Sequence, residues 1–218
     1  MSHERIPVHH ILFDAAETLI TKPDLLDRLC RTLELSGHSL DLGFVRERHK
    51  IVSESIQFPD KPDLEFYQVF NARLLATLGV PPSQALVEEV FAACRGLDWN
   101  AFDDTASLHE LNQPISVLSN FHRGLYNILN QFFDDMFEHV FVSEELGTAK
   151  PNTDFFQIAL ERLGCEPKHV LYVGDSIFLD MRPAAQLGMQ VCLIDRHHHF
   201  EHFTPRVSDL SQLVYFLT

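Results

Sequence analysis

A single aspartate stands at the end of the first apolar run of the chain. The run ILF at residues 11–13 leads into Asp14, and Thr18 follows four residues later. A carboxylate delivered by a buried strand can act as a nucleophile or as a ligand for a hard cation. A second carboxylate two residues further on would complete an acid/base pair, but that position holds Ala16. The stretch therefore indicates an active site that lacks one of its usual groups.

Polar residues also stand at the ends of later apolar runs. Ser119 and Asn120 follow ISVL, Lys150 precedes a proline at the start of a helical pattern, and Asp175 follows VLYVG, with Asp180 five residues beyond it. The carboxyl ends of parallel strands meet at one edge of a sheet, where open α/β proteins bind ligands. We therefore expect these side chains to gather around Asp14.

This set of groups suits phosphoryl chemistry. Asp14 and Asp175 can share Mg²⁺, which favours one or two carboxylates together with phosphate oxygens and water. The Ser119 hydroxyl and the Asn120 backbone amide can bind phosphoryl oxygens, and Lys150 can neutralise the charge that develops on them. One oxygen of Asp14 is then left for in-line attack, which gives a covalent aspartyl intermediate that water hydrolyses.

The hydropathy pattern supplies the elements that would position these groups. Short β-rich runs occur at residues 8–13, 115–118, 139–142, 169–173 and 190–194. Helical patterns separate the later runs, at residues 121–132, 152–164 and 178–188. This alternation predicts an α/β fold with a parallel sheet and helices on both faces.

A purely helical stretch interrupts this alternation after the first strand. Apolar residues recur at helical spacing over residues 24–37, 41–56, 63–79 and 83–97, with Asp, Ser or Pro near each start. We expect an α/β core domain from residues 1–20 and 101–218, and an inserted α-helical cap domain from residues 21–100. The helices should cap the carboxyl ends of the strands.

Composition excludes several classes of function. The formal charge of −14 and the absence of a Lys/Arg cluster disfavour nucleic acid as a partner. No run approaches the ~20 apolar residues of a membrane span. The N-terminus has no apolar signal segment, and the four cysteines are far apart without a C-x-x-C pair. We expect a cytoplasmic protein with reduced thiols and a small-molecule partner, while the oligomeric state is left open.

Four motifs in order resemble the haloacid dehalogenase (HAD) superfamily of hydrolases. These are FDAAETL around Asp14, VLSN at residues 117–120, Lys150 within GTAKPNTDFF, and VGDSIFLD at residues 173–180. A helical cap of the first type (C1) after the first motif fits the same family, and SNFHRGL and AKPNTDFFQIAL are similar to its phosphatase-like branch. The resemblance implies a Rossmann-like fold, Mg²⁺ as cofactor, and hydrolysis of a small phosphorylated substrate. It also implies that the backbone carbonyl at Ala16 binds the metal.

The sequence departs from that family where the first motif was incomplete. Family phosphatases usually carry a second aspartate at the position of Ala16, where it protonates the leaving alcohol and then activates water, and Glu17 replaces the glycine that usually follows. General acid/base help is worth ~10²- to 10⁴-fold in rate. Its loss should slow hydrolysis of esters with poor leaving groups.

Four interpretations follow from Ala16. The protein is a Mg²⁺-dependent phosphatase that takes its proton from Glu17, or from a cap residue such as His49, Lys50 or Glu54. Alternatively, it resembles phosphonatases, which use a cap lysine as an imine, or 2-haloacid dehalogenases, although Asp175 argues for a metal that they do not require. A catalytically weak relative that binds a phosphorylated ligand or a partner protein is the third interpretation, and a phosphoryl-transfer enzyme is the fourth.

Three residues of the motifs also have simple structural interpretations. Thr18 is expected to support its turn through hydroxyl bonds rather than to touch substrate. Asp180 falls in the first turn of a predicted helix, where the dipole favours any acid, and we assign it an indirect role at the metal. Glu17 fits a solvated turn better than a replacement acid.

Histidines and a cap lysine outside the motifs have simple interpretations as well. His49 and Lys50 are expected on an exposed helix face. The run His197–His199, with His202, could bind a transition metal, but a solvated loop is the preferred interpretation.

Overall fold

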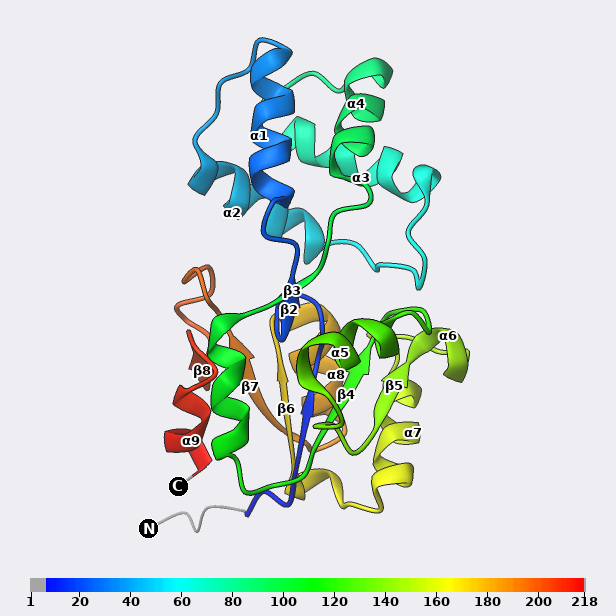
Figure 1. Cartoon of the computed structure of the whole chain (residues 1–218), viewed down its shortest axis with the longest axis vertical. Coiled ribbons are helices and arrows are strands. Elements are labelled where there is room, and N and C mark those ends of the chain that lie inside the picture. The colour runs from blue at the N-terminus through cyan, green and yellow to red at the C-terminus, as the bar shows by residue number, and fades with distance from the viewer. Residues whose placement is uncertain (1–6, 218) are drawn as a thin grey trace. The chain divides into compact units, whose positions relative to one another are not determined.

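The chain forms two compact units in the computed structural model, which describes residues 7–217, without the side chains of residues 215 and 216. The first unit contains the described residues up to Thr21 together with those from Ala101 onward, and the second contains Lys22–Asn100 (Figure 1). The helical second unit is inserted into the chain of the first, directly after its first strand and turn. Each unit is described below by itself.

The first unit is built on a six-stranded parallel sheet in the order β5-β4-β1-β6-β7-β8. Its strands are β1 (His10–Phe13), β4 (Ile115–Ser119), β5 (Val140–Val142), β6 (Val170–Gly174), β7 (Gln190–Ile194) and β8 (Arg206–Val207). Strand β1 lies between β4 and β6, so that Phe13 pairs with both Val117 and Val173. The ends of β1, β4 and β6 therefore meet where the strand order reverses, which is the usual ligand site of such sheets.

Helices cover this sheet on both faces, as the burial of its central strands shows. Every residue of β1, β4 and β6 is buried, although successive side chains of a strand point to opposite faces. The α-helices of this unit are α5 (Leu125–Phe133), α6 (Ser143–Leu146), α7 (Thr153–Leu163), α8 (Arg182–Gln186) and α9 (Gln212–Leu217). Phe155 and Phe156 of α7 are both fully buried in its hydrophobic core. The fold is the predicted Rossmann-like α/β fold.

Short elements complete this unit, and several of them were not predicted. Two 3₁₀ segments, η1 (Asp103–Glu110) and η2 (Pro167–His169), precede β4 and β6. The helix expected at residues 178–188 is divided into a π-turn, η3 (Ile177–Met181), and α8. The division lies next to Pro183, which has no N–H to donate and is best tolerated in the first turn of a helix. Strands β2 (Ile20–Thr21) and β3 (Asn100–Ala101), at the two points where the chain passes from one unit to the other, form a separate two-stranded sheet.

The second unit consists of four helices, α1 (Leu25–Leu35), α2 (Leu42–Ser53), α3 (Leu64–Thr77) and α4 (Gln84–Cys94). The side chains of Asp41, Asp63 and Ser83 accept hydrogen bonds from the backbone of the first turns of α2, α3 and α4. Leu33, Val45 and Leu75 are fully buried in a hydrophobic core of its own. None of the helices in the described part of the chain is long and apolar enough to cross a bilayer.

Candidate active site

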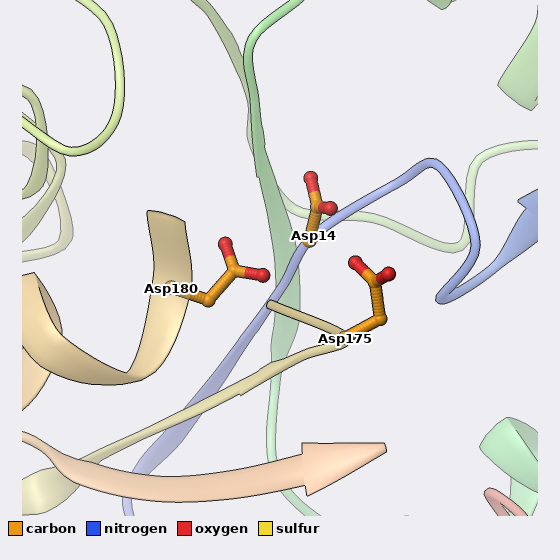
Figure 2. Close-up of side chains that lie close together, drawn as sticks. All are labelled: Asp14, Asp175 and Asp180. Atoms are coloured by element: carbon orange, nitrogen blue, oxygen red, sulfur yellow. The ribbon is translucent and has the colours of Figure 1, made fainter. Parts of the chain in front are cut away.

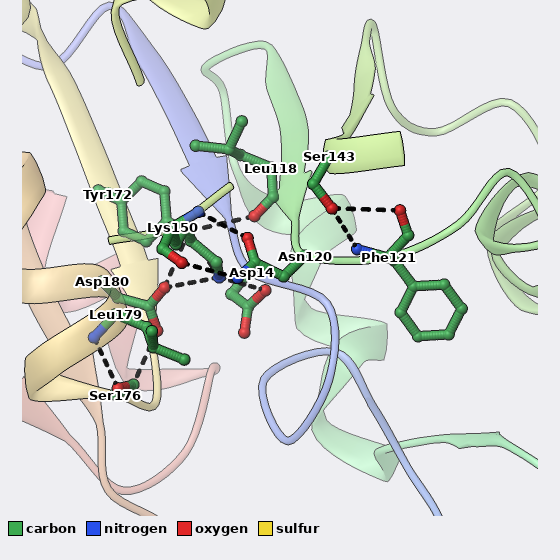
Figure 3. A network of polar contacts seen from close by, with 10 residues as sticks. All are labelled: Asp14, Leu118, Asn120, Phe121, Ser143, Lys150, Tyr172, Ser176, Leu179 and Asp180. Carbon is green, nitrogen blue, oxygen red and sulfur yellow. Dashed lines mark hydrogen bonds and ion pairs between the residues drawn. The ribbon is translucent and has the colours of Figure 1, made fainter. Parts of the chain in front are cut away.

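Asp14 directly follows β1 and is almost fully buried. Its backbone N–H donates to the carbonyl of Val173 on β6 (2.9 Å), which continues the sheet by one residue, and its side chain is 9% exposed. One carboxylate oxygen forms an ion pair with Lys150 Nζ at 2.7 Å (Figure 3). The strand thus holds the carboxylate in a fixed place at the sheet edge.

Lys150 forms ion pairs with two carboxylates at this edge of the sheet. Its Nζ lies 2.7 Å from Asp14 Oδ1 and 2.7 Å from Asp180 Oδ1, and its side chain is 2% exposed. Burial lowers the pKa of Lys150, but the two carboxylates outweigh that effect and raise the pKa above its ordinary value. The lysine is therefore a cation across the physiological range.

Asp180 is fully enclosed and has a partner for each oxygen. Oδ1 accepts from Lys150, and Oδ2 accepts from the backbone N–H of Ser176 at 3.0 Å. A Cβ at Gly174 would overlap this carboxylate, so the glycine at the end of β6 makes room for it. The side chain of Ser176 caps the turn by accepting from Leu179 N. These contacts fix the position of the Asp180 side chain. A fixed side chain is what we expect of a residue that orients its neighbours.

The hydroxyl of Tyr172 also belongs to this network, although the sequence did not identify it. It donates to the carbonyl of Leu118 on β4 at 3.2 Å and lies 3.1 Å from Asp180 Oδ1 and 3.3 Å from Lys150 Nζ. Burial, Asp180 and Asp14 all raise the pKa of Tyr172, so the hydroxyl keeps its proton. Within an apolar strand, this tyrosine could not be distinguished from an ordinary core residue.

Three carboxylates converge at this edge of the sheet (Figure 2). Asp14, Asp175 and Asp180 each offer an oxygen within 4.8 Å of the others. Burial, followed by the neighbouring Asp180 and Asp175, raises the pKa of Asp14 to about 7, against the opposing effect of Lys150. A divalent cation would relieve this repulsion, and oxygen donors are the ligands that Mg²⁺ prefers. The residues present therefore fit a magnesium ion.

Asn120 and Ser119 lie at the end of the neighbouring strand. Ser119, the last residue of β4, is 2% exposed. The side-chain amide of Asn120 accepts from Lys150 N at 2.7 Å and donates to Lys150 O at 2.9 Å. The residue after Asn120 is fixed by Ser143, whose hydroxyl accepts a hydrogen bond from Phe121 N at 3.0 Å. The structure thus brings the segment after β4 directly against the backbone that carries Lys150.

The turn after Asp14 differs in part from the expectation. Thr18 is fully buried, and its hydroxyl has no hydrogen-bond partner among the described residues, so the expected support of the turn by this hydroxyl was wrong. Ala16 is partly buried, while Glu17 is exposed, has a φ of 58°, and accepts from the Thr21 hydroxyl at 2.9 Å. The left-handed conformation explains why a glycine would suit this position.

The cap residues considered as proton donors lie at the end of α2. His49 and Lys50 are partly buried, so their expected place on an exposed helix face was wrong. The ring of His49 packs against Phe70 with centroids 5.2 Å apart, and Lys50 forms an ion pair with Glu54 at 2.9 Å. Both side chains of that ion pair are about 15% exposed.

The histidine run after β7 is arranged as a loop. His198 is exposed and lies 3.3 Å from Arg206, and the rings of His197 and His199 have centroids 5.8 Å apart. Asp195 holds the loop by accepting from the backbone of His199 at 2.8 Å. Among the described residues, the histidines do not take part in the group of three potential metal ligands found at the sheet edge.

Comparison with known proteins agrees with this geometry. The family model for haloacid dehalogenase-like hydrolases matches residues 8–188. A glyceraldehyde 3-phosphate phosphatase from Methanopyrus kandleri is 40% identical over 216 residues, which cover 91% of this chain and 88% of that protein.

Two solved structures share the fold at lower identity. A haloacid dehalogenase-like protein from Agrobacterium tumefaciens has a TM-score of 0.68 at 19% identity, covering 96% of this chain and 97% of that one. The Bacillus subtilis protein YfnB, solved bound to magnesium, has a TM-score of 0.64 at 18% identity, covering 97% and 99%. With the family model matched over most of its length, the chain belongs to the haloacid dehalogenase-like hydrolases.

Proposed function

We propose that this hydrolase is a magnesium-dependent phosphatase that acts on a small phosphorylated metabolite. The observation that carries the proposal is the buried chain of charges at one sheet edge, in which Lys150 lies 2.7 Å from both Asp14 and Asp180 and Asp175 lies beside them. Such an edge provides a nucleophile, a fixed cation and a place for a metal. Phosphoryl transfer needs these parts because its catalysis is mainly positioning and charge stabilisation.

Asp14 is the nucleophile in this proposal. One of its oxygens attacks phosphorus, the bond from phosphorus to the leaving oxygen breaks, and that oxygen takes up a proton. Water then attacks the aspartyl phosphate, gives up a proton and releases inorganic phosphate. Lys150 keeps Asp14 in place and offsets negative charge on the phosphoryl oxygens. The Ser119 hydroxyl and the Asn120 backbone amide bind those oxygens, and the buried Thr18 hydroxyl supplies a further donor at the turn.

The same edge would hold Mg²⁺ through Asp14, Asp175 and the backbone carbonyl of Ala16. Asp180 contributes indirectly, because its own oxygens already bind Lys150 and the Ser176 backbone. When bound, Mg²⁺ neutralises the phosphoryl group and helps to align it with the nucleophile.

Glyceraldehyde 3-phosphate is the first substrate to test. The Methanopyrus kandleri relative that carries this substrate in its name matches most of both chains, and phosphate esters of similar size fit the same class. We further place the enzyme in the cytoplasm, because none of the four cysteines, all within the described residues, forms a disulfide.

Release of inorganic phosphate from glyceraldehyde 3-phosphate and from an aryl phosphate tests the proposal. Activity should require Mg²⁺, disappear with a chelator, and fall by at least about 10³-fold in Asp14→Asn. Asp175→Asn should raise the Mg²⁺ concentration needed for half-maximal activity. Metal-independent halide release from a 2-haloacid, or phosphonoacetaldehyde cleavage that Lys50→Arg abolishes, would replace this proposal with one of the other family reactions.

A further inference from the structure

Arg196, two residues after β7, joins segments of the core unit that are far apart in the chain. Its Nη2 donates to the backbone carbonyl of Thr18 at 2.8 Å. Its guanidinium also binds both carboxylate oxygens of Asp104 in η1 and lies over the ring of Phe102, 3.7 Å from the centroid. One side chain therefore bridges the turn after Asp14, the segment that returns from the helical unit, and the end of β7.

Arg196 and Asp104 form a mostly buried ion pair with charge-assisted hydrogen bonds. The side chains of Arg196 and Asp104 are 13% and 8% exposed, and Asp104 Oδ2 also accepts from Leu210 N at 2.9 Å. Two-point arginine–carboxylate pairs are stronger and more directional than a single hydrogen bond. Asp104 thus fixes the plane of the guanidinium, and that plane aims Nη2 at the Thr18 carbonyl.

The Thr18 carbonyl lies in the turn that follows the nucleophile. Within this turn, Ala15 O accepts from Leu19 N at 2.8 Å and from Ile20 N at 3.0 Å. Leu19 O in turn accepts from Phe102 N at 3.1 Å. The Arg196 side chain and the Phe102 backbone N–H therefore bind two successive carbonyls of the turn, those of Thr18 and Leu19.

We propose that Arg196 is a positioning residue for the phosphatase reaction, acting through the turn at residues 15–20. This inference rests on the proposed function, in which Asp14 attacks and the Ala16 carbonyl binds the metal. Asp14 directly precedes the turn that Arg196 contacts, and Ala16 lies near its start. A displacement of about 1 Å at a reacting group can cost roughly 10²-fold in rate, so a loosened turn should lower kcat.

Only an arginine can make all of these contacts at once. A planar guanidinium binds a carboxylate with two donors, donates a further bond to a carbonyl, and stacks on an aromatic ring. A lysine at this position would keep the charge beside Asp104 but would lose the fixed fork and the stacking. Arg196→Lys therefore separates loss of the charge pair from loss of positioning.

The experiment compares Arg196→Lys and Arg196→Met with the control Arg206→Met. Arg206 lies in the neighbouring β8 and pairs with Asp195. With an aryl phosphate and Mg²⁺, both Arg196 variants should lose about tenfold or more in kcat with KM changed less than about twofold, whereas the control should match the wild type. Arg196→Lys should lose less thermal stability than Arg196→Met, because it keeps a positive charge beside Asp104.

Amide hydrogen exchange supplies a readout that does not depend on activity. The amides of residues 17–20 should exchange at least about tenfold faster in both Arg196 variants, while those of β6 should stay at wild-type rates. Unchanged exchange in the turn, or a wild-type kcat in Arg196→Lys, would overturn the inference. If the wild type itself hydrolysed no phosphate ester, the proposed function would fail, and the exchange result would still decide whether Arg196 holds the turn.

Discussion

The side chain of Asn120 holds the backbone of Lys150 at two points. It accepts from Lys150 N at 2.7 Å and donates to Lys150 O at 2.9 Å, across thirty residues of sequence. Because the lysine side chain connects two buried carboxylates, its backbone must be fixed before its ammonium can be. Asn120 is therefore a support for the ion pairs as well as a neighbour of Ser119 at the end of β4.

Asn120→Ala removes both of these bonds while the backbone amide stays in place. We expect kcat to fall about tenfold or more and the free energy of unfolding to fall by about 1 to 3 kcal/mol. Asn120→Asp keeps the acceptor for Lys150 N and should give an intermediate loss. Steady-state kinetics and urea unfolding of both variants measure these effects, and wild-type kinetics in Asn120→Ala would show that the contact is dispensable.

Ala16→Asp restores a carboxyl group two residues after the nucleophile. If this position serves general acid/base catalysis, turnover of an alkyl phosphate should rise by ~10²- to 10⁴-fold, with a much smaller rise for an aryl phosphate whose leaving group needs no proton. Ala16→Asn, which is similar in size but not acidic, is the matched control. Equal gains for the two substrates would mean that the added group acts on binding or folding instead.

Tyr172→Phe removes the hydroxyl that lies within hydrogen-bond distance of Lys150 Nζ and Asp180 Oδ1. The ring stays in the core, where it packs 5.1 Å from the ring of Phe156, but Leu118 O loses its donor. We expect a loss of about 1 to 2 kcal/mol in stability and a several-fold loss in kcat with little change in KM. Thermal denaturation and initial rates test this prediction, which an unchanged kcat in a destabilised variant would contradict.

We expect the burial of His49 to make the helical unit sensitive to acid. Burial, together with the neighbouring Lys50, lowers the pKa of His49 to about 4, whereas an unfolded histidine titrates near 6.5. Between these pH values the unfolded state binds more protons than the folded state. The contribution of His49 to the free energy of unfolding is therefore fully present above about pH 6.5 and is lost as the pH falls toward 4. Because the residue is only partly buried, we expect this loss to be about 1 to 3 kcal/mol over this range.

His49→Gln removes this titration. Urea unfolding at several pH values should show a shallower acid loss in the variant than in the wild type. Identical slopes between pH 6.5 and 4 would mean that His49 takes up its proton as readily in the folded chain as in the unfolded one.

The sequence was sufficient for the fold because strong local patterns agree with it. The run at residues 190–194 became β7 without change, and Asp41, Asp63 and Ser83 start helices where capping residues were expected. The two-residue strands β2, β3 and β8 were missed, since so few residues carry no periodicity. The broken helix at Pro183 was missed because proline is also tolerated in a first turn.

Members of the candidate site were predicted where a charged residue follows an apolar run or opens the next helical pattern. Asp14 and Asp180 each lie 2.7 Å from Lys150 Nζ. Tyr172 and Arg196 gave no such signal, because one resembles a core aromatic and the other lies beside a histidine run. Tyr172 contacts Leu118 O, Lys150 and Asp180, and Arg196 contacts Thr18 O and Asp104, between 8 and 178 positions away in the chain, so these contacts follow no local pattern.

The covalent intermediate on Asp14 is the most direct test of the account. Borohydride added during turnover reduces an aspartyl phosphate to homoserine, which peptide mass spectrometry can locate. The account predicts homoserine at position 14 in the wild type with Mg²⁺ and substrate, and none in Asp14→Asn or without substrate. Steady turnover with an unmodified Asp14, or homoserine at another carboxylate, would contradict it.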